Sequence, residues 1–284
     1  MITAILGVIV FVLGFIFIDN KTVDYESFSV GADNIKSEAV SGLKIAHLSD
    51  LHFPRIKVNL DEMLEKIKEE QVDFIAITGD IIDRGAEVNA CGVLRFIEKV
   101  TRVAPVFYVH GNHEKNHPQE QFLYNALRSN GVVFLENEST NVSFGDKRVT
   151  LIGLTDNTEY NYSFIKNNPE IKNNYKILLA HRPEQKKWLS YISENNQIPP
   201  HLVLTGHAHG GQFRFFGQGL VAPNQGLFPK FDAGLYTHTG QYPYETAPER
   251  SPQTVNMIVS RGIGNSAFPF RFNNNPHIPI ITVC

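Results

Sequence analysis

Cysteine is scarce in this sequence: there are two in 284 residues, Cys91 and the final residue, Cys284. A disulfide framework and a thiolate metal site both need more cysteines at closer spacing, so both are excluded, and the redox compartment is left open. A strong net charge is also absent, because the formal charge is −3 at pH 7. Nucleic-acid-binding domains normally carry a basic face, so no nucleic-acid partner is expected.

Charged side chains are missing from one long stretch at the N-terminus. Residues 1–18, MITAILGVIVFVLGFIFI, contain no Asp, Glu, Lys or Arg. As a helix they span about 27 Å, close to the thickness of a bilayer hydrocarbon core. We therefore predict one transmembrane helix that anchors the chain. The alternatives are a cleaved signal peptide, although no basic start or A-x-A cleavage site is present, and a buried core helix, which would normally keep a polar face.

The orientation of this anchor has little support from the sequence. Lys21 and Lys36 follow the apolar segment and no Lys or Arg precedes it, which under the positive-inside rule favours a cytoplasmic domain. Two lysines do not decide the matter, so the side of the membrane is left open. Residues 19–42 are polar and are interpreted as a linker that can include a first short strand at 25–30. The folded domain is predicted to span residues 43–284.

The rest of the chain alternates between apolar runs and amphipathic segments, which predicts an α/β fold. Residues 59–71 and 89–100 carry apolar side chains at helical spacing. A long irregular segment is expected at 217–253, where Gly, Pro and aromatic residues are dense, with 229–245 as a packed loop, a lid or a bilayer-facing edge. Buried strands are expected at residues 43–49, 73–78, 105–110, 149–154, 176–181 and 201–205.

Polar clusters follow five of these strands. In an α/β sheet the loops at the carboxyl ends of strands converge, so residues far apart in sequence can meet at one point. Of the histidines that are not assigned to these clusters, we expect His117, His201, His238 and His277 at the surface or in loops. The five clusters contain Asp50 and His52; Asp80, Asp83 and Arg84; Asn112 and His113; His181; and His207 and His209.

Seven of these residues form a ligand set suited to two metal ions. In D-x-H and H-x-H on extended backbone both side chains point to the same side, and one carboxylate such as Asp80 can bridge two ions. A mixed nitrogen and oxygen set without thiolate suits Mn, Fe or Zn better than Ca, or Mg alone. The predicted ligands are Asp50, His52, Asp80, Asn112, His181, His207 and His209.

The series D-x-H, G-D-x-x-D, G-N-H-E, a lone His and G-H-x-H resembles the calcineurin-like metallophosphoesterase superfamily. Three stretches, HLSDLHFPR, GHAHGGQFRF and VSRGIGNSAFPFRF, are similar to the membrane-associated bacterial group of YkuE- and YaeI-type phosphodiesterases. Over residues 43–284 the resemblance implies a four-layered α/β/β/α sandwich of two mixed β-sheets. It implies one ion held by Asp50, His52, Asp80 and His209, and a second held by Asp80, Asn112, His181 and His207.

The resemblance also implies a dimetal-dependent phosphohydrolase, in which a metal-bound hydroxide attacks phosphorus. His113 would stand on the leaving-group side as general acid or hydrogen-bond donor, and Asp83 would orient it. Arg84 has two interpretations. GDIIDRG also occurs in Ser/Thr protein phosphatases, where this arginine would clamp a phosphate, and the alternative is a solvated loop arginine.

We therefore expect an enzyme that hydrolyses a phosphodiester or pyrophosphate. The anchor alone suggests a lipid or cell-envelope substrate. A phosphomonoesterase of the Ser/Thr protein phosphatase type is the first alternative, and the close G-H-x-H pair and the apolar segment argue against it. A catalytically silent metal-binding scaffold is the second, and the presence of every expected ligand argues against that. The oligomeric state is left open.

Overall fold

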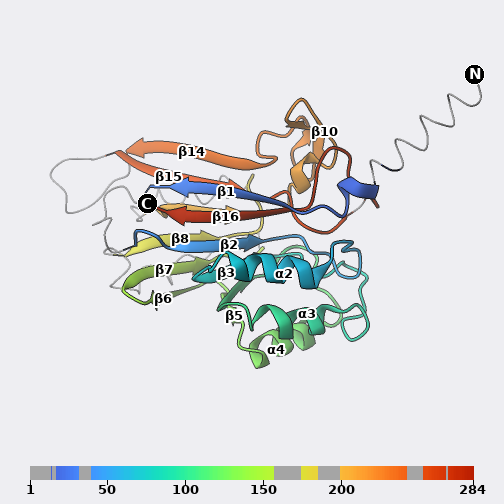
Figure 1. Cartoon of the computed structure of the whole chain (residues 1–284), viewed down its shortest axis with the longest axis horizontal. Coiled ribbons are helices and arrows are strands. Elements are labelled where there is room, and N and C mark those ends of the chain that lie inside the picture. The colour runs from blue at the N-terminus through green and yellow to red at the C-terminus, as the bar shows by residue number, and fades with distance from the viewer. Residues whose placement is uncertain are drawn as a thin grey trace, which may run out of the picture.

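The computed structural model describes residues 14, 17–31, 40–156, 174–184, 199–241, 252–266 and 268–284. These residues form two six-stranded mixed β-sheets, and three helices pack on the outer face of the first sheet (Figure 1). The predicted pair of mixed sheets is therefore confirmed. Within the described ranges helices cover the first sheet alone, and the fourth layer of the predicted sandwich stays a prediction.

The first sheet has the strand order β1-β16-β2-β3-β4-β5. Strands β2 to β5 run parallel, and so do β1 and β16, whereas β16 and β2 are antiparallel. The short first strand predicted at 25–30 is present as β1, at the edge of this sheet. The strands are β1 Asp24–Val30, β2 Lys44–Leu48, β3 Phe74–Thr78, β4 Val106–Val109, β5 Val133–Phe134 and β16 His277–Val283.

The second sheet has the order β14-β15-β9-β8-β7-β6. Its four central strands run parallel, and the two outer strands, β14 and β6, are antiparallel to their neighbours. The expectation of an irregular segment at 217–253 was wrong in part, because eight residues of it pair with β15 and this pairing holds the chain extended. The strands are β6 Glu138–Phe144, β7 Lys147–Gly153, β8 Tyr175–Leu179, β9 Leu202–Thr205, β14 Gly234–Gln241 and β15 Pro252–Val259.

Two small hairpins lie between β9 and β14. In the first, β10 Arg214–Phe215 pairs with β11 Gln218–Gly219. In the second, β12 Val221–Ala222 pairs with β13 Gly226–Leu227. Each strand is two residues long, so few backbone hydrogen bonds hold either hairpin.

Helices α2 Leu60–Glu69 and α3 Val93–Val100 confirm the two predicted helical segments, and α4 Glu120–Ser129 was not predicted. The start of α2 follows from its sequence, because the Asn59 side chain accepts the Asp61 backbone N–H at 3.2 Å. Acidic residues in its first turn and lysines in its last turn match the helix dipole.

The hydrophobic core has two layers around the first sheet. Ile75 and Ile77 of β3 face the helices, whereas Phe74 and Ala76 face the second sheet. Successive side chains of a strand point to opposite faces, so a strand buried on both sides appears as a continuous apolar run. This is the reason that DFIAIT could be recognised as a strand.

The predicted transmembrane helix at residues 1–18 lies almost wholly outside the described residues. Among those that are described, no helix is both long enough and apolar enough to cross a bilayer. Immediately after it, Asp19 and Asn20 are buried. Asp19 Oδ2 accepts the Asn274 N–H at 3.0 Å, and Asn20 Oδ1 accepts the Arg271 N–H at 2.9 Å. The chain that follows the apolar segment is therefore fixed to residues 271–274.

Candidate metal centre

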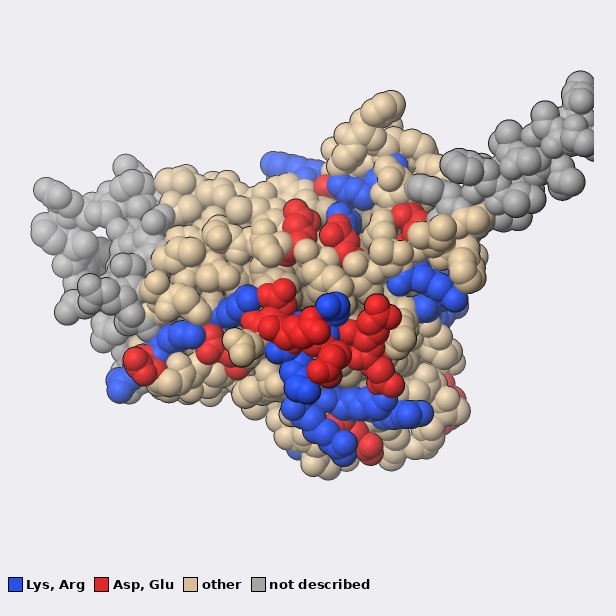
Figure 2. Space-filling model, viewed as in Figure 1, with Lys and Arg blue, Asp and Glu red and all other residues tan. Residues whose placement is uncertain are grey.

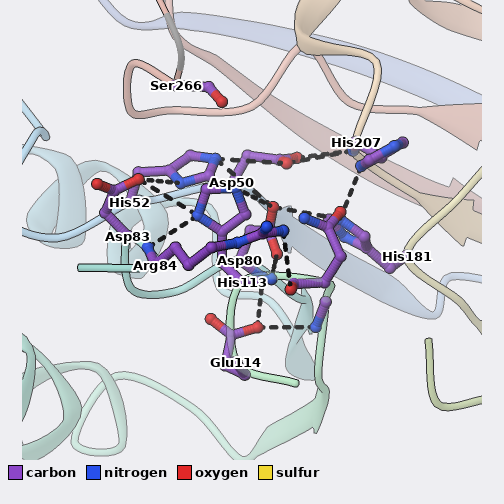
Figure 3. A network of polar contacts seen from close by, with 12 residues as sticks. Asp50, His52, Asp80, Asp83, Arg84, His113, Glu114, His181, His207 and Ser266 are labelled. Atoms are coloured by element: carbon purple, nitrogen blue, oxygen red, sulfur yellow. Dashed lines mark hydrogen bonds and ion pairs between the residues drawn. The ribbon is translucent and has the colours of Figure 1, made fainter. Parts of the chain in front are cut away.

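The polar clusters that follow β2, β3, β4, β8 and β9 come together in one centre (Figure 3). Both sheets contribute, because the parallel strands of each sheet end at the same edge. The structure thus brings together all seven predicted ligands. Six of them are no more than 5% exposed: Asp50, His52, Asp80, His181, His207 and His209.

The backbone at the centre turns sharply. Five of the predicted ligands have φ between 49° and 65°, in the left-handed region that side chains with a Cβ rarely adopt. The extended backbone expected for D-x-H and H-x-H was therefore wrong, and turns bring these side chains together instead. Strained residues of this kind persist where the surrounding structure forces them, and they cluster at functional sites. The five are Asp50, His52, Asp80, His207 and His209.

Two glycines allow these turns to approach one another. A Cβ at Gly206 would collide with Ser49 Oγ and the Asp50 carboxylate, and one at Gly111 would collide with the Asp80 carboxylate. The space left at Gly206 lets Asp50 Oδ2 accept the His207 N–H at 3.0 Å. The loops after β2 and β9 are thereby joined.

One cluster of ligand atoms lies on the side of β2. His52 Nε2 is 3.1 Å from His209 Nε2 and 3.7 Å from Asp80 Oδ2. Asp50 Oδ1 is 3.4 Å from His209 Nε2. Asp50, His52 and His209 each offer one atom within 4.8 Å of the others, so this group could hold a metal ion.

A second cluster is centred on His181. Its Nε2 lies 3.4 Å from Asp80 Oδ2, 3.1 Å from His207 Nδ1 and 3.2 Å from Asn112 Oδ1. Asp80 Oδ2 therefore faces both clusters. Imidazole nitrogens that share an ion at about 2.1 Å stand roughly 3 Å apart, as the two His–His pairs do. The nitrogen and oxygen donors present fit two divalent ions.

Asp80 and His181 carry opposite charges in the protein itself. Burial acts to raise the pKa of Asp80, but His181, with His52 and His113, holds that pKa well below its ordinary value. Burial acts to lower the pKa of His181, but Asp80 outweighs it and the pKa rises to about 10. One proton on His181 thus neutralises the carboxylate, and a metal ion would compete with that proton.

The other imidazoles are neutral near pH 7. Burial lowers the pKa of His52 to about 3 and places those of His207 and His209 well below the ordinary value. Burial also raises the pKa of Asp50 to about 6. A neutral imidazole has a free lone pair, so these three rings are in the protonation state that metal binding requires.

His113 stands at the edge of the centre with Asp83 and Arg84. Its Nδ1 accepts the Arg84 backbone N–H at 3.0 Å and lies 3.2 Å from Asp83 Oδ1. With Nδ1 as acceptor, the proton of the neutral ring is on Nε2, which lies 3.8 Å from Asp80 Oδ2. His113 could also hold an ion together with His52 and Asp80. Its predicted role as donor stays a prediction.

The Arg84 side chain is exposed at the mouth of the centre. Within the described ranges no carboxylate forms an ion pair with it, and its guanidinium lies 3.5 Å from the Asn112 carbonyl oxygen. Arg84 and Asn112 line a cavity of about 580 Å³, and so do Arg182, Asp156 and Asn224. Arg182 forms a two-pronged ion pair with Asp156, so the cavity beside the centre is polar and carries both signs of charge.

Glu114 is a functional residue that the sequence reasoning missed. Its buried carboxylate accepts three backbone N–H groups, from Asp80 at 2.9 Å, Ile82 at 3.1 Å and Gly111 at 2.8 Å. It therefore fastens the loop after β3 to the loop after β4. Burial, with the charge of Asp80, raises its pKa to about 7. The signal was the final letter of the GNHE motif.

Arg271 was also missed. Its side chain is fully buried, and one guanidinium nitrogen lies 3.4 Å from His209 Nδ1 and donates to the Gly264 carbonyl oxygen at 2.5 Å. A second nitrogen donates to the Arg261 carbonyl oxygen at 2.7 Å. Burial lowers its pKa to about 10. The guanidinium thus contacts Nδ1 of His209, the ring nitrogen that faces away from His52.

The similarity of this chain to known proteins is consistent with a metal-binding phosphoesterase site. Residues 43–211, more than half of the chain, match the family described as calcineurin-like phosphoesterase. The chain therefore belongs to the calcineurin-like phosphoesterases, and the predicted family and enzyme class are confirmed.

Individual relatives share the family at modest identity. An uncharacterized metallophosphoesterase of Bacillus subtilis, YkoQ, is 29% identical over 83% of this chain and 82% of its own length. The Escherichia coli phosphodiesterase YaeI is 27% identical over 84% of this chain and 81% of its own. Among solved structures, a 5′-nucleotidase precursor from Thermus thermophilus has a TM-score of 0.50 at 15% identity, over 78% of this chain and 49% of that chain. This last likeness concerns the fold alone.

Proposed function

We propose that the protein is a dimetal-dependent phosphohydrolase that acts on a phosphodiester or a pyrophosphate. The observation that carries the proposal is the position of Asp80 Oδ2, which faces His52 Nε2 at 3.7 Å and His181 Nε2 at 3.4 Å. One carboxylate between two groups of imidazoles is the arrangement that two neighbouring ions need. Asp50, His52, Asp80 and His209 would hold one ion, and Asp80, Asn112, His181 and His207 the other.

Ions bound there would supply a water of lowered pKa and would neutralise charge on the phosphoryl oxygens. The chain's own groups account for the other requirements. In the protonated ring, His113 Nε2–H donates to the departing oxygen, and Nδ1–H donates to Asp83 Oδ1, which orients the ring. The Arg84 guanidinium, exposed at the cavity, binds a phosphoryl oxygen.

Turnover of a substrate panel by the purified full chain tests the proposal, with metal content measured on the same sample. We expect phosphodiesters or pyrophosphates to be hydrolysed faster than monoesters, and the rate to follow metal content. A preference for monoesters would favour the protein phosphatase type. Full metal content without turnover of any ester would favour a silent scaffold.

We also propose that residues 1–18 anchor the protein in a membrane, with the side left open. Their length and lack of charge support this. Deletion of residues 1–18 keeps Asp19 and Asn20, which the fold buries. The shortened chain should remain folded and bind metal without membranes. Aggregation with loss of metal would place the segment in the folded core.

A further inference from the structure

One side of the molecule exposes a group of large apolar side chains. Of the eleven large hydrophobic side chains that are exposed in the described part of the chain, eight lie in three segments, residues 17–18, 213–228 and 266–272. We call this surface the aromatic face. Its exposed members are Phe17, Ile18, Phe215, Phe216, Leu227, Phe228, Phe268 and Phe270.

The three segments form one continuous surface. The ring of Phe213 lies 5.2 Å from that of Phe268 and 5.6 Å from that of Phe270, so the first hairpin packs against residues 266–272. The Phe228 N–H donates to the Leu220 carbonyl oxygen at 2.9 Å, which joins the two hairpins. Asn20 is hydrogen-bonded to Arg271 and holds the N-terminal segment beside them.

The pictures show the same arrangement. The β10 hairpin projects at the upper right of the molecule, near the blue N-terminal helical turn, and α4 lies at the bottom (Figure 1). The tip of this projection carries few charged side chains, whereas basic and acidic residues crowd the region of the helices (Figure 2).

Three exposed lysines stand at the border of the aromatic face. Lys21 stands 4.1 Å from the Phe17 ring centroid, Lys57 donates to the Pro269 carbonyl oxygen at 2.6 Å, and Lys230 lies beside the second hairpin. Asp19 and Asp232, the acidic residues that follow the first two segments in the sequence, are buried. Lysines around an exposed apolar surface are typical of proteins that rest on anionic lipid headgroups.

We propose that the aromatic face lies on a lipid bilayer, with its phenylalanines at the level of the headgroups and upper acyl chains. The apolar segment 1–18 ends on this face at Phe17 and Ile18. A chain that enters the face from a segment of membrane-spanning length favours lipid over a second protein copy as the occupant. The hairpins and residues 266–272 are a second, independent contact with the same bilayer.

The aromatic face also borders the metal centre. Ser266, next to residue 268 on the face, lies over the centre, and its carbonyl oxygen accepts a hydrogen bond from Arg55 at 2.6 Å (Figure 3). Asn224, in the turn of the second hairpin, lies 3.1 Å from His207 Nε2. A bilayer contact would therefore bring phosphoesters of the membrane surface to the centre. This consequence rests on the proposed function, whereas the bilayer contact itself does not.

Fluorescent labels on the full chain test the contact without any measurement of activity. In a Cys91→Ser, Cys284→Ser background, one new cysteine is introduced by Phe216→Cys or Phe228→Cys and labelled with the polarity-sensitive dye NBD. Phe122→Cys is the matched control, since Phe122 is an exposed phenylalanine on α4. The chain is then reconstituted with vesicles of phosphatidylcholine and phosphatidylglycerol whose acyl chains carry a nitroxide quencher.

We expect the quencher to remove about half or more of the emission at 216 and at 228, and less than about a tenth at 122. Because two positions are labelled in separate variants, the test can still be made if one variant fails to fold. Equal quenching at all three positions would overturn the proposal, and so would a chain that stays in solution. Emission at 216 and 228 that responds to protein concentration and not to the quencher would identify a second copy as the occupant, which also overturns it.

Discussion

The metal centre and the aromatic face lie side by side and depart from the usual distribution of polarity in opposite senses. The centre buries two carboxylates and four imidazoles, and the face leaves eight large apolar side chains in contact with solvent. Charged groups are rarely buried without partners, and contiguous apolar patches are rarely left exposed. Departures of both kinds occur where binding, more than stability, selects the residue.

The two regions also differ in the number of hydrogen bonds that hold their loops in place. At the centre Glu114 joins two loops through three backbone hydrogen bonds, and Asp50 joins two more through the His207 N–H. At the aromatic face the strands of both hairpins are two residues long. A substitution at the centre should therefore affect many groups, whereas one at the tip of the face should stay local.

The largest effect is expected for Asp80→Asn, which removes the carboxylate that lies between the two clusters of ligand atoms. One carboxylate faces both clusters, so its loss should lower the occupancy of both metals and reduce turnover by orders of magnitude. Metal analysis and kinetics on one sample measure both effects. Asp146→Asn, at an exposed turn, is the control. An Asp80→Asn protein with full metal content and normal turnover would contradict the shared role of Asp80.

His113→Ala should have the next largest effect, and one that depends on the substrate. If His113 donates to the departing oxygen, both metals should remain, and the loss should grow with the basicity of the leaving group. We expect little change for a nitrophenolate and about a hundredfold loss for an alkoxide. His238→Ala, on an exposed part of β14, is the control. Equal losses for all leaving groups together with metal depletion would instead make His113 a ligand.

Glu114→Gln should weaken the centre without removing a ligand. Glu114 Oε2 accepts two N–H groups and Oε1 a third, so an amide NH2 in either position would face a donor. The two loops should shift, and metal affinity should fall by about tenfold. Metal titration measures this, with the exposed Glu98→Gln as control. Unchanged metal affinity would show that the carboxylate stabilises the fold alone.

The convergence of polar residues could be predicted because each cluster follows a strand that is itself apolar. The buried strands β2, β3, β4, β8 and β9 are apolar runs, and parallel strands end at a common edge. The order of the strands in the sheets could not be derived in this way, because β14 and β16 contain Gly or Pro, and β16 pairs with β1 and β2 near the other end of the chain. Glu114 is the last residue of GNHE, and its role was missed because its three partners are backbone groups, which no sequence motif identifies.

Exposure was the hardest property to predict. Phe213 and Phe216 stand three residues apart in the same run, yet Phe213 packs between two aromatic rings and Phe216 is fully exposed. His277 was expected at the surface or in a loop, and it is buried in β16; His201 lies in a loop as expected but is buried there. The position of each side chain depends on which distant segment packs against it, and local sequence does not contain that information.

A histidine outside the metal centre should also make the free energy of unfolding depend on pH. His201 is buried away from both regions, its Nδ1 accepts the Lys176 N–H at 3.0 Å, and burial, with the charge of Lys176, lowers its pKa to about 2. Between this value and the ordinary 6.5 the unfolded chain binds the proton and the folded chain does not. Its contribution to stability is therefore complete above pH 6.5 and is lost as pH falls, by up to about 1.4 kcal/mol per pH unit.

In His201→Gln the free energy of unfolding should consequently change less steeply between pH 6.5 and pH 4 than in the unsubstituted protein. Denaturant unfolding at several pH values measures these slopes. Identical slopes would show that His201 does not contribute to the acid sensitivity.

The smallest effect is expected at the tip of the aromatic face. Phe216 is fully exposed, so Phe216→Ser should change the free energy of unfolding by less than about 0.5 kcal/mol. Phe213→Ser, in the same run, removes a ring that packs on two others and should destabilise by about 2 kcal/mol. Turnover of a water-soluble diester should be unchanged in Phe216→Ser, because the substitution leaves the centre intact. A large loss of stability in Phe216→Ser would mean that this side chain is packed inside the folded protein, and the contrast between the two regions would then fail.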